Sequence, residues 1–177
     1  MDSFSSRLIL SLVFLIFSCF CFATNNELDW KVSSDDDLIR YETHGTTVYG
    51  HKFGLLKYKA SCNRKFLWLS WSSNDKNVAE FKGQDAVIKF TVGDVSFEAE
   101  VPLLSAKQLT PLTTVMAFTN FIMGDKFIAL LEKGSEIEVQ IISPALLVSK
   151  LDIKKDRFSL NSFTTAQKES KKLCQVN

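Results

Sequence analysis

The fold of this 177-residue chain is decided most clearly by the stretch AVIKFTVGDVSFEAEV, residues 86–101. Two runs rich in β-branched and aromatic residues alternate apolar with polar side chains, and Gly93-Asp94 joins them. A two-residue loop that contains glycine suits the primed turns of a tight β-hairpin. The stretch therefore predicts an antiparallel hairpin in a mainly β protein.

Strand-like patterns continue on both sides of this hairpin. The run 66–71 carries large apolar residues on both faces, so we expect a central strand that is covered on each side. In the run 53–62, Leu56, Tyr58 and Cys62 share one face, and Lys57 lies on the other. The remaining predicted strands are 30–32, 38–43, 136–142 and 157–160.

Helical spacing appears in two places. From Thr110 to Lys133 apolar residues recur with a helical period, and Gly124-Asp125 divides the stretch into two short helices. At the C-terminus one stripe, behind an N-cap at Ser162 or Asn161, contains Phe163, Ala166, Ser170, Leu173 and Cys174. We therefore expect an antiparallel β-sandwich-like domain with a central helical insertion and a C-terminal helix.

The first 23 residues have the pattern of a secretory signal peptide. Arg7 precedes an apolar run from Leu8 to Phe17, and cleavage after Ala23 fits the small residue Cys21 three positions from the cut. The run is shorter than the ~20 apolar residues of a membrane span. An uncleaved anchor and a lipid-modified Cys19 are the alternatives. We expect a signal peptide at 1–23 and one exported, periplasmic or secreted, domain at 24–177.

The charge pattern argues against nucleic acid as a partner. The formal net charge is +1, and removal of the signal peptide takes one acid, Asp2, and one base, Arg7. Nucleic-acid-binding domains are usually clearly basic. Acidic residues gather in 24–49 and basic residues in 150–177, which favours two solvated faces that attract each other within the fold.

The cysteines indicate one disulfide. Cys19 and Cys21 leave with the signal peptide, so the exported domain keeps Cys62 and Cys174. A pair of cysteines in an exported chain is typical of a structural bridge. Neither has histidine or further cysteine ligands nearby in sequence, so we expect no metal and no cofactor.

Candidate binding residues lie in a loop and on the aromatic strand. The two histidines, His44 and His51, flank Tyr49 in a glycine-bearing loop, and they lack the helical spacing of a zinc protease motif. We interpret the histidines as exposed loop residues. Trp68 and Trp71 lie on the strand 66–71 and fit either the core or a recognition surface.

Catalytic motifs are few. The sequence has no G-x-S-x-G elbow and no phosphate-binding glycine loop, and Asp35-Asp36-Asp37 lacks the alternating spacing of a calcium loop. Carboxylates that meet only in space could still cleave a glycosidic bond, and Glu98, Glu100 and Asp94 on the hairpin are the candidates. A non-enzymatic protein is the favoured interpretation.

The order of these features resembles two groups of exported bacterial proteins. The resemblance rests on Trp30 with Val32, the strand that ends in Cys62, the aromatic strand behind it, and the terminal residues from Phe158 to Cys174. The chain looks like the type VI secretion-associated periplasmic proteins and, more distantly, the invasion-associated locus B family. It departs from them in having Asn161-Ser162 where they keep a glycine. The resemblance implies a non-enzymatic β-rich envelope protein with a Cys62–Cys174 bridge.

We therefore expect a protein that binds an envelope or secreted protein, as a secretion-system accessory or protective factor. One alternative is an inhibitor or immunity protein that presents the loop His44–His51 or Asp35–Asp37 to a hydrolase or toxin. Another is a carboxylate-dependent envelope hydrolase.

Overall fold

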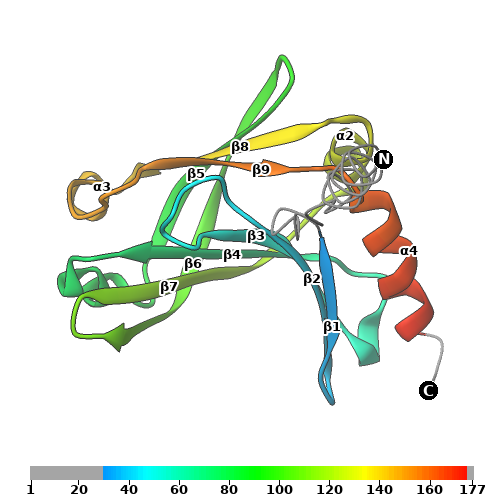
Figure 1. Cartoon of the computed structure of the whole chain (residues 1–177), viewed down its shortest axis with the longest axis horizontal. Coiled ribbons are helices and arrows are strands. Elements are labelled where there is room, and N and C mark those ends of the chain that lie inside the picture. The colour runs from blue at the N-terminus through cyan, green and yellow to red at the C-terminus, as the bar shows by residue number, and fades with distance from the viewer. Residues whose placement is uncertain (1–29, 175–177) are drawn as a thin grey trace, which may run out of the picture.

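The structure is a computed structural model that describes residues 30–174. The predicted signal peptide and the alternatives for residues 1–23 lie outside the described residues. Nine strands form one antiparallel sheet in the order β1-β2-β3-β4-β7-β6-β5-β8-β9, and the sheet is curled into a half-barrel (Figure 1). The protein is therefore mainly β, as predicted.

The strands and helices follow one another along the chain with short connections. The strands are β1 (Lys31–Ser34), β2 (Leu38–His44), β3 (Lys52–Tyr58), β4 (Phe66–Ser73), β5 (Asp85–Val92), β6 (Val95–Thr110), β7 (Thr113–Ile122), β8 (Glu136–Ser143) and β9 (Lys155–Ser159). The α-helices are α2 (Asp125–Lys133), α3 (Ala145–Ser149) and α4 (Phe163–Leu173), and the 3₁₀ helices are η2 (Lys59–Ser61) and η3 (Lys76–Phe81). None of the helices within residues 30–174 combines the length and the apolar character needed to cross a membrane.

The hairpin predicted from residues 86–101 is confirmed. Strands β5 and β6 pair from Asp85 opposite Pro102 to Val92 opposite Val95. Gly93 in the turn has φ +56°, a left-handed conformation that glycine adopts without steric cost. Strand β4 also takes the predicted central position, between β3 and β7.

Strand β6 explains why the sheet is continuous instead of two separate sandwich layers. Its first half pairs with β5, and from Leu103 onward it pairs with β7 on its other side. The register shifts between Leu103 and Ser105, and such bulges bend a strand. One 16-residue strand therefore links both walls of the half-barrel.

The predicted helical insertion is wrong over its first half. Residues Thr113–Ile122 form strand β7, and only Asp125–Lys133 is helical. Thr114, Met116 and Phe118 are buried at every second position, which is the period of a strand. Pairing with β4 and β6 on both sides outweighs the helical spacing of the apolar residues.

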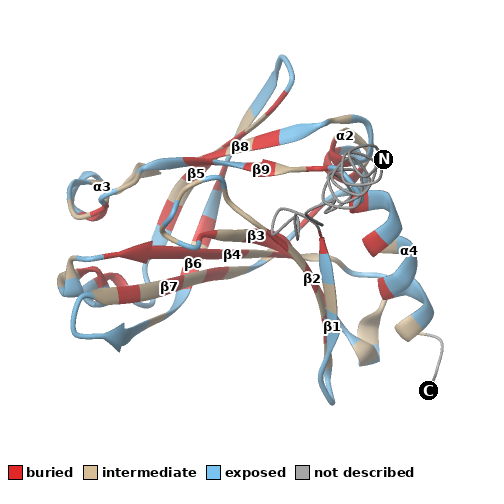
Figure 2. Ribbon diagram, in the orientation of Figure 1, coloured by how far each residue is buried: buried red, intermediate tan, exposed pale blue. Residues whose placement is uncertain are grey.

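The core lies on the concave side of the sheet, and tryptophan side chains join its two walls. Trp71 on β4 donates from Nε1 to the carbonyl of Ile153 at 2.7 Å, and Trp30 donates to the carbonyl of Ser159 at 2.8 Å. A bridge between Gly45, just after β2, and Phe158 on β9 brings opposite ends of the strand order together. Figure 2 shows buried residues alternating with less buried ones along these strands.

Helix α4 closes one end of the half-barrel and carries the predicted disulfide. Cys62, which follows η2, is bonded to Cys174 at the end of α4, with 5.9 Å between the Cα atoms. The predicted inward stripe is confirmed at Phe163, Ala166 and Ser170, all of which are buried. The Phe163 ring lies 4.9 Å from Trp30 and 6.2 Å from Tyr41, measured between centroids. Ser162 occupies the N-cap position without a side-chain capping bond.

Two local expectations need correction. Strand β3 ends at Tyr58, and the predicted strand residues up to Cys62 form the 3₁₀ turn η2 instead. Lys57, predicted on the face opposite Leu56, lies on the core-facing side of β3 with Phe53 and Leu55, and it is only 3% exposed because α4 covers it there. Because α4 is more than 100 residues away in the sequence, the local alternation pattern of β3 cannot show that this helix packs against it.

Candidate functional site

The loop between β2 and β3 is held against the opposite wall by a buried His51–Asp156 pair. His51 Nδ1 lies 2.9 Å from Asp156 Oδ2, and its Nε2 donates to the carbonyl of Ser72 at 3.3 Å. Both side chains are completely buried. The His51 ring also stacks on Trp71, with centroids 3.9 Å apart. The prediction that both histidines are exposed is therefore wrong for His51.

The Asp156 carboxylate is the centre of this network. Thr47 donates to Oδ2 at 2.7 Å, and Thr46 donates to Oδ1 from its backbone and its hydroxyl at 3.1 and 3.0 Å. The backbone N–H of Arg157 donates to Oδ1 at 2.8 Å. Burial raises the pKa of Asp156, but the hydrogen bonds from His51, Thr47, Arg157 and Thr46 outweigh it and lower that pKa. The carboxylate is thus stabilised in its ionised form and fixes the loop to β9.

Sequence reasoning missed Asp156. The residue lies 105 positions from His51, and nothing in the sequence links the two. A local signal was available, because Asp156 and Phe158 share one face of β9 and Phe158 is fully buried. A carboxylate on an apolar face needs a buried partner.

The five predicted binding residues do not form one surface. His51 and Trp71 are buried in the interior, which leaves no area for direct contact with a partner. Tyr49 and His44 are half-buried in or beside the β2–β3 loop. Trp68 is also half-buried, and the Arg40 guanidinium lies over its ring at 4.4 Å from the centroid. Their role in binding stays a prediction.

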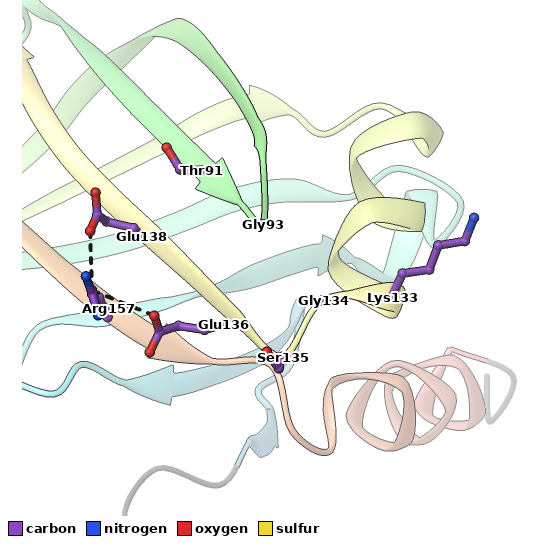
Figure 3. Close-up of a pocket in the computed structure, with 8 residues that line it drawn as sticks. All are labelled: Thr91, Gly93, Lys133, Gly134, Ser135, Glu136, Glu138 and Arg157. Atoms are coloured by element: carbon purple, nitrogen blue, oxygen red, sulfur yellow. Dashed lines mark hydrogen bonds and ion pairs between the residues drawn. The ribbon is translucent and has the colours of Figure 1, made fainter.

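A surface hollow of about 510 Å³ lies where β5, β8, β9 and the end of α2 meet (Figure 3). Arg157 Nε lies 3.3 Å from Glu138 and 3.7 Å from Glu136, as the dashed lines in Figure 3 mark. All three side chains are in contact with solvent, and such exposed pairs contribute about 0–1 kcal/mol. The proposed hydrolase carboxylates Glu98 and Glu100 do not line this hollow.

We examined the side chains of residues 30–174 that could bind a metal ion. Across residues 30–174, no group of three or more His, Cys, Asp or Glu side chains is placed to hold a metal ion. Glu42, the carboxylate nearest to His44 in sequence, accepts a hydrogen bond from Lys52 Nζ at 2.6 Å.

The second half of β6 forms an open edge with exposed leucines. From Ser105 to Thr110, β6 pairs with β7 on one side, and no strand among residues 30–174 pairs with its other side. Leu109 is 61% exposed and Leu112 in the following turn is 74% exposed. The turn that joins β6 to β7 lies at the opposite end of the molecule from α4 (Figure 1). We name residues 104–112 the hairpin edge.

Comparisons of the chain with protein-family models, curated proteins and solved structures give no match.

Proposed function

We propose that this is a non-enzymatic exported protein that binds another protein of the cell envelope through the hairpin edge. The observation that carries the proposal is a strand edge that ends in exposed leucines and that is left unpaired by every strand of the described residues 30–174. Free backbone N–H and C=O groups on an edge strand can pair with an added strand, and native proteins usually protect such edges. Large apolar side chains next to the edge favour a partner that brings an extended, partly apolar segment.

The proposal includes a periplasmic location and an accessory or protective role. The disulfide between Cys62 and Cys174 is consistent with an oxidising compartment such as the periplasm. The resemblance to secretion-associated periplasmic proteins favours an accessory or protective role. The partner's identity would separate these roles.

The test is affinity capture from envelope extracts with a matched set of variants. Leu109→Lys/Leu112→Lys places charges on the hairpin edge, and Leu146→Lys is the control because Leu146 on α3 is 71% exposed. We expect a partner, identified by mass spectrometry, that the wild type and the control retain and the edge variant loses. Equal retention by all three proteins would exclude the hairpin edge as the binding surface.

An inhibitor or immunity role is a second candidate, favoured by the β2–β3 loop. Val48 at its tip is 99% exposed, while Asp156 anchors Thr46 and Thr47 beside it. A loop that is rigid before binding loses little entropy when it enters a partner's cleft. Val48→Asp should then abolish inhibition of a captured hydrolase or toxin, whereas Leu109→Lys should not. The reverse pattern would assign binding to the hairpin edge.

A further inference from the structure

A second hollow lies between β3, α2 and α4 beside the disulfide, at the opposite end of the molecule from the hairpin edge. Its volume is about 610 Å³, within the usual range of small-molecule sites. Its charged lining residues come from separate elements and are Lys57, Lys65, Lys168, Lys171, Asp125 and Glu132. Four cations therefore face two carboxylates.

Lys57 is the unusual member of this set because it is buried. Its side chain is 3% exposed, and Nζ donates to Ser170 Oγ at 2.9 Å. The Tyr41 ring centroid lies 5.5 Å from the same nitrogen. No carboxylate of residues 30–174 lies within 4.0 Å of Lys57 Nζ. A buried ammonium is normally paired with an anion, since its desolvation is costly.

The neighbouring lysines add to this excess of positive charge. Burial, together with the positive charges of Lys65 and Lys171, lowers the pKa of Lys57 to about 8. Lys65 has a counter-ion in Asp125 at 3.8 Å, but the Asp125 side chain is fully exposed to solvent. The hollow therefore contains a buried ammonium group, that of Lys57, which is still protonated at pH 7. The carboxylates that line the hollow do not pair with its charge.

We propose that this hollow, which we name the lysine pocket, binds a small oxyanionic ligand carrying a phosphate or carboxylate group. Lys57 provides the buried ion pair, and Lys168 and Lys171 on α4 contact the ligand from the rim. The volume admits a molecule larger than a single phosphate ion. The disulfide holds the end of α4 beside Cys62, so it keeps the rim lysines over the pocket. This site is independent of the hairpin edge, which lies at the opposite end of the molecule.

The charged and titratable groups that face Lys57 come from each element packed against it. They are Tyr41 on β2, Lys65 before β4, Asp125 and Glu132 on α2, and Lys168 and Lys171 on α4. An anion bound to Lys57 favours its charged form, so ligand binding at pH 8 should be accompanied by proton uptake. A lysine that serves only the structure would show no such uptake.

The test is isothermal titration calorimetry of the mature, oxidised protein with inorganic phosphate and, separately, with citrate. We expect saturable one-site binding of at least one of them below about 10 mM. Binding of phosphate alone assigns the phosphate class, and binding of citrate alone assigns the carboxylate class. Titrations at pH 8 in two buffers of different ionisation enthalpy measure the proton uptake.

Three variants complete the design. Lys57→Met should weaken binding at least tenfold and remove the proton uptake. Lys168→Gln/Lys171→Gln changes only exposed side chains, so it folds normally and should also weaken binding. Lys82→Gln, an exposed lysine after η3, should bind like the wild type. Absence of saturable binding by the wild type, or an equal loss in Lys82→Gln, would overturn the proposal.

Discussion

The disulfide should supply a large part of the stability of this domain. Cys62 and Cys174 are 112 positions apart, so the bridge closes most of the described chain into one loop. Loop closure in the unfolded state is valued at about 5 kcal/mol for a loop of this length. Small domains have a total free energy of unfolding of about 5–15 kcal/mol. Removal of the bridge should therefore cost roughly a third of the stability or more.

Folding itself should survive this change. Phe163 and Ala166 in the first half of α4 are buried through contacts that do not involve either cysteine. We expect Cys62→Ala/Cys174→Ala to keep a native near-ultraviolet circular dichroism spectrum. Its urea midpoint should fall by an amount that corresponds to about 4–5 kcal/mol.

Reductant provides the matched control. Dithiothreitol should lower the midpoint of the wild type toward that of the double variant and leave the double variant unchanged. A double variant within about 1 kcal/mol of the oxidised wild type would refute the argument from loop entropy.

Three further predictions concern the buried polar groups. Gly45→Ala should destabilise the protein by more than about 2 kcal/mol in urea, because its Cβ would collide with the Asp156 carboxylate, whereas Gly124→Ala, with open space around it, should be nearly neutral. The pKa of Asp156 is lowered on folding, so the carboxylate stabilises the folded state above about pH 4, and this stabilisation is lost as the pH falls through the folded pKa. Asp156→Asn should lower the free energy of unfolding by about 3–5 kcal/mol at pH 7, and the stability of the variant should depend less on acid than that of the wild type. A wild-type stability that does not change with acid would contradict this prediction. The pKa of Lys57 falls from 10.5 to about 8 on folding, so the stability of the wild type should rise from pH 8 toward 10.5. Lys57→Met should lack this rise and should be more stable than the wild type at pH 7 by about 1–3 kcal/mol, after allowance for solvent screening. A variant less stable than the wild type at pH 7 would contradict this prediction.

Sequence patterns predicted most of the individual strands, because alternation is a local property. The hairpin around Gly93-Asp94 is an example, since its turn and both of its strands lie within about 16 residues. The failure at Thr113–Ile122 shows the limit of such patterns. Met116 and Phe118 fit a strand, yet nearby apolar residues also fit a helix, and only the pairing with β4 and β6 decides between them.

The candidate sites were much less predictable. Hairpin-edge leucines are ordinary apolar residues in the sequence. They matter because no strand within residues 30–174 pairs with one side of the second half of β6. Alternation placed Lys57 on the face opposite Leu56, and only the position of α4 shows that this face is covered and that Lys57 is buried. In each case the decisive fact is the presence or absence of a segment that is distant in the sequence.

By itself the sequence determined the mainly β class, the inward face of the last helix and the pairing of Cys62 with Cys174. These follow from the strand and helix periods of the sequence and from the two cysteines that remain beyond the predicted signal peptide, which need no knowledge of distant contacts. Only the tertiary structure decided that one curled sheet forms, that His51 meets Asp156, and that Lys57 is buried. The contacts of His51 with Asp156 and of Lys57 with Ser170 join residues more than 100 positions apart, and their energies depend on burial, which a linear pattern does not record.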